Sequence, residues 1–122
     1  MSENLDDDAI EFANQLFDGA RNNKAEFVAG AVRQGVPVNM QDSNGNTLLM
    51  LAAYNGSAET VAALADLGAD VNLLNDRGQS PLAGAVFKRD LALVQLLLQR
   101  GADPNLGTPS AADTAKMFGV EL

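Results

Sequence analysis

The residue types that catalysis uses most often are missing from this sequence. Its 122 residues include no histidine and no cysteine, which excludes Ser–His–Asp and Cys–His catalytic arrangements and Cys/His zinc sites. Phosphate-binding loops of the types Gly-x-x-x-x-Gly-Lys and Gly-x-Gly-x-x-Gly do not occur either. The sequence therefore predicts no enzyme activity, no metal ion and no cofactor.

Carboxylates are the remaining groups that could do chemistry. Asp70 and Asp103 occupy equivalent positions, 33 residues apart, and a pair of carboxylates can act as acid and base or hold a metal ion. Both residues, however, belong to the same repeated turn, Gly-Ala-Asp-x-Asn. We therefore expect them to accept local hydrogen bonds rather than to form a site.

Acidic residues also crowd the first eleven positions, without any Lys or Arg among them: Glu3, Asp6, Asp7, Asp8 and Glu11. One interpretation is a solvated start to the first helix, where carboxylates suit the positive end of the helix dipole. The other is a docking patch. In that case the protein would be an acidic inhibitor or decoy that occupies a basic surface.

The sequence as a whole is acidic, with 16 acidic against 8 basic residues and a formal net charge of -8. This balance argues against binding to nucleic acids or to anionic membranes. The most apolar run, Leu91 to Leu98, is far shorter than the roughly 20 residues that cross a bilayer. No secretory signal is visible at the N-terminus. We expect a cytoplasmic protein that is a monomer in the absence of a partner. A periplasmic location is the alternative.

Three sets of identical residues recur with a period of 33, which indicates that the chain is built from repeated structural units. They are Gly35, Gly68 and Gly101; Asn39, Asn72 and Asn105; and Val28, Val61 and Val94. A fixed period of this length is typical of a stacked repeat protein. Such proteins usually work through a surface built from several repeats.

Each repeat contains the signals of two helices. Thr47 and Ser80 can cap a first helix with their hydroxyl groups, and Pro81 suits the first helical position. Ser57 and Asp90 are placed to cap the second helices, which should end at the repeated glycines. Polar, turn-rich segments, here called fingers, join one repeat to the next.

The two ends differ from the middle, as terminal repeats should. The first helix is expected at about residues 6–20, with Ile10, Ala13 and Phe17 sealing the open end of the stack. The last finger is shortened, and residues 110–119 predict a single short helix. Residues 1–122 thus form one domain, divided into a capping repeat (about 6–40), two internal repeats (41–73 and 74–106) and a shortened cap (107–122).

The motifs Gly78-Gln-Ser-Pro-Leu and Gly-Ala-Asp-x-Asn make the chain resemble the ankyrin-repeat family, over about residues 12–119. The histidine of that family's pattern is replaced by Phe17, Met50 and Ala83. The resemblance implies an all-α repeat solenoid of helix-turn-helix units joined by β-turn fingers. It also implies a non-catalytic module that binds a protein through its finger tips and concave helical face. Such a module could regulate or stabilise a partner enzyme; a structural homo-oligomer is the alternative.

Positions whose residue types do not follow the repeat pattern are the candidate contacts with a partner. They are Gln41, Ser43, Asn44, Asn46, Met50, Tyr54, Asn55, Leu74, Asp76, Arg77, Gln79, Phe87, Lys88 and Arg89. Tyr54 and Phe87 occupy equivalent positions and could form an aromatic anchor beside the basic residues; alternatively, both rings pack against the neighbouring repeat. Leu74 is expected to be an exposed apolar tip.

Overall fold

The computed structural model describes the backbone of residues 2–122 and the side chains from residue 7 onwards. This part of the chain forms seven α-helices without a sheet. They are α1 (Ser2–Arg21), α2 (Ala25–Arg33), α3 (Leu48–Tyr54), α4 (Ala58–Asp66), α5 (Pro81–Phe87), α6 (Leu91–Gln99) and α7 (Ala111–Phe118). Among these residues, no helix combines the length and apolarity needed to cross a membrane.

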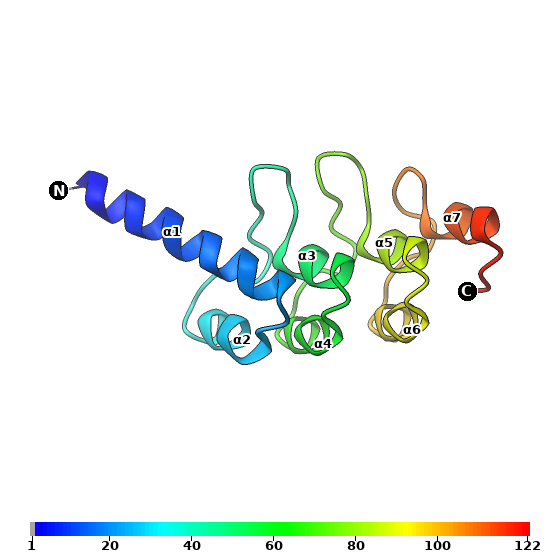
Figure 1. The fold of residues 1–122 in the computed structure, drawn as a ribbon, viewed down its shortest axis with the longest axis horizontal. Coiled ribbons are helices and arrows are strands. Elements are labelled where there is room, and N and C mark those ends of the chain that lie inside the picture. Colours follow the sequence, from blue (N-terminus) through cyan, green and yellow to red (C-terminus); the bar gives the residue numbers. More distant parts are fainter. Residues whose placement is uncertain (1) are drawn as a thin grey trace.

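The helices form two rows, as Figure 1 shows. Helices α1, α3, α5 and α7 pack side by side in a first row, and α2, α4 and α6 pack in a second row beneath it. The fingers project from the opposite side of the first row. This arrangement confirms the predicted all-α repeat solenoid.

The apolar column of the repeats lies between the two rows. Val28, Val61 and Val94 are at most 1% exposed, and Leu64 and Leu97 of the second row are fully buried. A single repeat has too few residues to cover these side chains itself, so each relies on its neighbours.

Local capping chemistry sets most helix starts as predicted. The hydroxyl oxygens of Thr47 and Ser80 accept hydrogen bonds from the backbone N–H groups of α3 and α5, at 3.0 and 3.1 Å. Asp90 caps α6 at 3.2 Å. The prediction is wrong for Ser57, which makes no side-chain cap. Its hydroxyl instead donates to the carbonyl oxygen of Arg21 in the preceding repeat, at 3.2 Å.

The last helix, α7, begins and ends as the sequence predicts. The Ser110 hydroxyl accepts a hydrogen bond from the backbone N–H of Asp113 at 3.1 Å. Gly119 ends the helix in the left-handed conformation, with φ of 67°. The shortened finger that precedes α7 places this helix directly against α5.

Helix α1 departs from the prediction at its start. It begins at Ser2 rather than near residue 6, and its first half extends beyond the stack (Figure 1). Phe17 is buried, but Ile10 is 59% exposed, so the prediction that Ile10 seals the stack is wrong. Asp7 and Asp8 are exposed, whereas the side chains of Glu3 and Asp6 lie outside the described residues.

Adjacent fingers are joined by the repeated asparagines. The Asn39 side-chain oxygen accepts the backbone N–H of Asp70, and that of Asn72 accepts the N–H of Asp103, both at 2.8 Å. The Asn72 amide also donates to the Gly101 carbonyl at 3.1 Å. Asp70 and Asp103 each accept the backbone N–H two residues further along the chain at 2.9 Å. Their predicted local role is therefore confirmed.

We predict that Asn72→Ala lowers the free energy of unfolding by about 1–2 kcal/mol, because two bonds between neighbouring repeats are lost. Urea denaturation measures this effect. Asn105→Ala is the matched control, because Asn105 occupies the same column but is exposed, and its expected loss is below about 0.5 kcal/mol. Equal losses in the two variants would contradict the role of Asn72 as an inter-repeat link.

Candidate functional site

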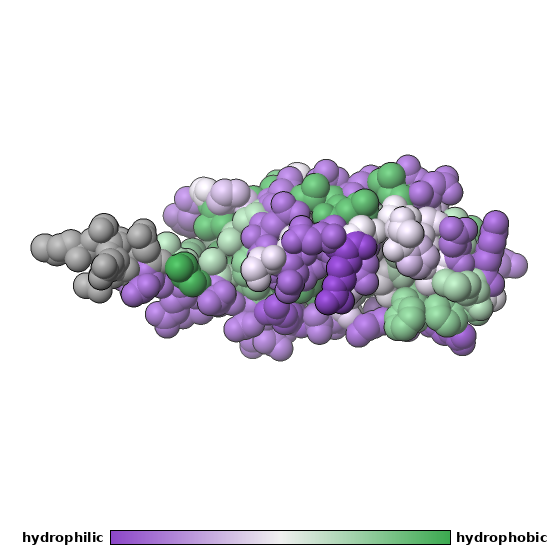
Figure 2. Space-filling view, turned by 90° about the horizontal axis from the view of Figure 1, so that it is seen from above, coloured by the Kyte–Doolittle hydropathy of each residue, from purple (hydrophilic) through white to green (hydrophobic). Residues whose placement is uncertain are grey.

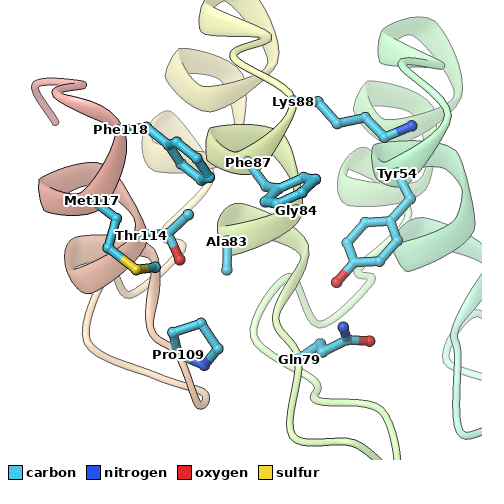
Figure 3. Close-up of a pocket in the computed structure, with 10 residues that line it drawn as sticks. All are labelled: Tyr54, Gln79, Ala83, Gly84, Phe87, Lys88, Pro109, Thr114, Met117 and Phe118. Carbon is cyan, nitrogen blue, oxygen red and sulfur yellow. The ribbon is translucent and has the colours of Figure 1, made fainter.

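A groove opens on the first row of helices, between α3, α5 and α7 (Figure 3). We call it the aromatic groove; its volume is about 360 Å³. The residues that line it are Tyr54, Gln79, Ala83, Gly84, Phe87, Lys88, Pro109, Thr114, Met117 and Phe118. Most of them are apolar, and Lys88 is the one charged residue among them.

Large apolar side chains stay open to water along this groove. Phe87 is 64% and Met117 65% exposed. The rings of Phe87 and Phe118 meet edge to face, with their centroids 5.4 Å apart. Figure 2 shows apolar (green) surface at the C-terminal end of a face whose middle is mainly hydrophilic. Clustered apolar exposure of this kind marks interaction surfaces.

The wall of the groove depends on a close approach between Tyr54 and Gly84. A Cβ atom added at Gly84 would overlap Cε1 and Cδ1 of the Tyr54 ring. Because Gly84 has no side chain, the ring lies directly against the backbone of α5. The half-buried position raises the pKa of the Tyr54 hydroxyl, since burial disfavours the charged phenolate.

A second, more polar pocket adjoins the aromatic groove and shares Tyr54 and Gln79 with it. We call it the finger pocket; its volume is also about 360 Å³. It is lined by Asn44, Asn46, Tyr54, Asn75, Asp76, Arg77 and Gln79. The two pockets together form one surface that changes from apolar to polar.

Asn75 holds the finger pocket together. Its amide nitrogen donates to the side-chain oxygens of Asn46 at 2.9 Å and of Gln79 at 2.8 Å. Its own oxygen accepts the backbone N–H groups of Arg77 and Gln79, both at 3.0 Å. Asn75 is 9% exposed, so these bonds fix two neighbouring fingers in one arrangement.

Arg89 lies at the edge of the aromatic groove in a strained backbone conformation. Its φ is 57°, in the left-handed region. For a residue with a side chain this conformation is about 1–2 kcal/mol less favourable than the right-handed one. The equivalent positions in the preceding repeats hold Asn23, with φ of 59°, and Gly56, with φ of 70°. Residues of those two types tolerate this conformation better. The Arg89 guanidinium lies 5.6 Å from the centroid of the Phe118 ring.

The structure brings together most of the candidate contact residues. Those that line the two pockets are Asn44, Asn46, Tyr54, Asp76, Arg77, Gln79, Phe87 and Lys88, and Arg89 adjoins them through Phe118. The two aromatic residues differ despite their equivalent positions. Tyr54 packs against the backbone of α5, whereas Phe87 touches Phe118 of α7 at its edge and stays 64% exposed. Both rings thus contact the neighbouring unit, and a partner-binding role for Phe87 stays a prediction.

The remaining candidates lie elsewhere or are engaged in local bonds. The side chain of Gln41 donates to the Gly45 carbonyl, and that of Asn55 donates to the Leu51 carbonyl, both at 2.8 Å. Ser43 is exposed but lines neither pocket.

Two of the predictions need correction. Met50 is fully buried, so it cannot contact a partner. Leu74 is half-buried rather than an exposed tip.

The sequence did not point to the contribution of α7. Pro109, Thr114, Met117 and Phe118 follow the shortened finger, where the 33-residue alignment no longer applies, and they belong to what the sequence identifies only as a cap. Asn75 was also missed. Its signal is the column that it shares with Asp42, whose carboxylate likewise accepts the N–H groups two and four residues further on, both at 2.9 Å.

The side chains that the structure describes include no group of three or more acidic residues suited to a metal ion. The residues that line the two pockets offer apolar contact, side-chain amides and the charges of Lys88, Arg77 and Asp76.

Comparison with known families finds three copies of the ankyrin repeat in residues 16–108. The chain is also similar to a curated ankyrin repeat protein of Pseudomonas aeruginosa, with 47% identity over 50 residues. That segment is 41% of this chain but 29% of the relative. The similarity thus covers less than a third of that protein's length.

We predict that Gly84→Ala pushes the Tyr54 ring into water and lowers the pKa of its hydroxyl towards the ordinary value. Tyr54 is the only tyrosine and the chain has no tryptophan, so absorbance of the phenolate in an alkaline titration reports on this ring alone. Gly30→Ala is the control, because a Cβ there meets no atom within 4 Å. An unchanged titration midpoint in Gly84→Ala would show that the groove does not depend on this glycine.

The sign of the pH effect follows from the direction of this shift. Because the pKa of Tyr54 is raised in the folded state, the folded chain holds the phenolic proton more tightly than the unfolded chain. The resulting contribution to the free energy of unfolding is fully present below the pKa of Tyr54 in the unfolded chain. That stability is lost as the pH rises through the folded pKa.

We predict that Arg89→Gly leaves the free energy of unfolding within about 1 kcal/mol of wild type. Relief of the left-handed strain, about 1–2 kcal/mol, offsets the lost cation–π contact and the greater freedom of glycine in the unfolded chain. The reverse change in the preceding repeat, Gly56→Arg, should lower stability by about 1 kcal/mol or more. Urea denaturation measures both, and a large loss in Arg89→Gly would mean that Arg89 is a structural residue.

Proposed function

This chain belongs to the ankyrin-repeat family, and we propose that it binds a protein partner in the aromatic groove and the adjoining finger pocket. Ankyrin repeats are protein–protein interaction modules. In this proposal the chain catalyses no reaction itself and regulates or stabilises the partner that it holds.

The exposure of Phe87 and Met117 carries the proposal. Burying apolar surface is the main favourable term in protein association, at about 25 cal/mol per Å² removed from water. Aromatic side chains in particular supply the few contacts that dominate an interface. Phe87 projects at the mouth of the groove (Figure 3), where a partner can cover it without moving the helices.

The rigidity of the site supports the same function. Packing of the Tyr54 ring on α5 fixes one wall, and the bonds of Asn75 fix the fingers. A preformed surface avoids the entropy of ordering loops on binding. We therefore expect the partner to bind with little rearrangement of this chain.

The acidic start of α1 is a second candidate surface. Its first half extends beyond the stack and leaves Asp7, Asp8 and Glu11 exposed. A basic partner bound there would lose affinity steeply with salt. The variant with Asp7→Asn, Asp8→Asn and Glu11→Gln distinguishes this surface from the groove.

We predict that Phe87→Ser weakens capture of the partner by at least about tenfold, because an aromatic anchor is removed from the interface. The measurement is affinity capture from the host lysate, with quantitative mass spectrometry of the retained proteins. Leu91→Ser is the matched control, since Leu91 is 58% exposed but lies on α6 in the second row.

A protein retained equally by wild type and Phe87→Ser, but lost by the triple variant of α1, would move the binding site to the acidic end. Unfolding curves of both serine variants check that each remains folded.

A further inference from the structure

Three of the eight basic residues of this acidic chain lie at the groove. Lys88 lines the aromatic groove, Arg89 lies over Phe118 at its edge, and Arg77 lines the finger pocket. The ion pairs found among the described residues join Arg21 to Asp18 and Arg100 to Asp66. They use none of the three basic residues at the groove, whose charges therefore remain available to a ligand.

The lining residues balance these charges only in part. The aromatic groove has no acidic residue among them, and the finger pocket has one, Asp76. With a net charge of -8 over the whole chain, a groove bordered by cations is a local exception. Arg89 places a positively charged side chain there although its backbone is strained. Strain that persists in a fold is often tied to function.

From this charge pattern we infer that the partner inserts a large apolar side chain that has an Asp or Glu close beside it. The inference rests on the proposed function and names the chemistry of the bound segment. The apolar side chain fills the space between Phe87 and Met117, and the carboxylate pairs with one of the two cations, Lys88 on the α3 side (Figure 3) or Arg89 over Phe118. The chain beyond the anchor runs past the Tyr54 hydroxyl, which points into the groove (Figure 3). The side-chain amides of Asn44 and Gln79 then bind its backbone, because that of Asn75 is occupied by bonds within the finger pocket.

A second copy of this chain could offer similar chemistry, because α1 presents exposed Asp7 and Asp8 near Ile10 and Phe12. Two copies, however, each carry a net charge of -8. Like charges on both molecules oppose their association at long range. The bound segment therefore belongs to a different protein, and self-association becomes an outcome of the test.

The test is selection from a phage-displayed library of random peptides of 12 residues. Wild type should enrich sequences that pair Phe, Leu, Trp or Met with Asp or Glu within a few positions. The variant Lys88→Glu/Arg89→Glu should lose the preference for acidic residues and acquire one for Lys or Arg. Lys24→Glu/Arg33→Glu carries the same change of charge at α2 and should select the same peptides as wild type.

Binding of one enriched peptide, measured by fluorescence polarisation, gives the size of the effect. Replacing its acidic residue by the amide should weaken binding about fivefold at physiological salt, and less at high salt. The neutral variant Lys88→Gln/Arg89→Gln should show the same weakening without introducing repulsion. Circular dichroism confirms that each variant is folded.

The outcomes separate this inference from the proposed function. Enriched apolar peptides without carboxylates, or an acidic preference that survives charge reversal, would overturn the inference and leave the groove as a binding site. Failure of wild type to enrich any peptide would count against the groove itself. A mass that rises with concentration in wild type but not in Lys88→Glu/Arg89→Glu would identify a second copy as the occupant.

Discussion

The burial of one apolar column between two rows of helices determines the rest of this structure. Val28, Val61 and Val94 repeat at a fixed spacing and are shielded only because each repeat stacks on the next. That stacking sets the distance between first-row helices, and with it the distance between fingers. The asparagine bonds between fingers use the same spacing. A surface that spans three repeats can therefore be rigid although no covalent cross-link joins one repeat to the next.

Within such a periodic stack, the groove that we propose as the binding site lies where one repeat departs from the period. The position of Gly84 holds Leu51 in the preceding repeat, where the side chain is buried. Loss of that side chain lets the Tyr54 ring lie on α5, and the adjoining space becomes a groove. The shortened last finger has a comparable effect, since it brings the aromatic residue of α7 against Phe87. Neither change disturbs the apolar column, so the fold tolerates both.

The sequence predicts the features of this fold that depend on residues close together in the chain. Caps at Thr47, Ser80 and Ser110, and the bonds of the aspartates in the repeated turns, are contacts over two or three residues, and residue type with position determines them. Ser57 shows the limit, because its hydroxyl bonds a carbonyl 36 residues away instead of its own helix. Met50 shows another, since departure from the repeat pattern does not distinguish an exposed side chain from a buried replacement. The contribution of α7 depends on where the shortened finger places the helix, which spacing alone does not give.

If Arg89 contacts the partner as we propose, stability and recognition are opposed at this one position. A glycine or asparagine suits the left-handed turn between the two helices of a repeat, and the two preceding repeats have one of each. Arginine there is less favourable in its backbone conformation, and a cation–π contact with the ring of Phe118 offsets part of that cost. It also places a positive charge beside an apolar groove. Because the stack is held by its buried column, strain of about 1–2 kcal/mol at an exposed turn is a small part of the interactions that hold the fold together. The same argument covers Phe87, since an aromatic side chain left in water contributes little to the folded chain alone and gains its stabilisation only when another surface covers it.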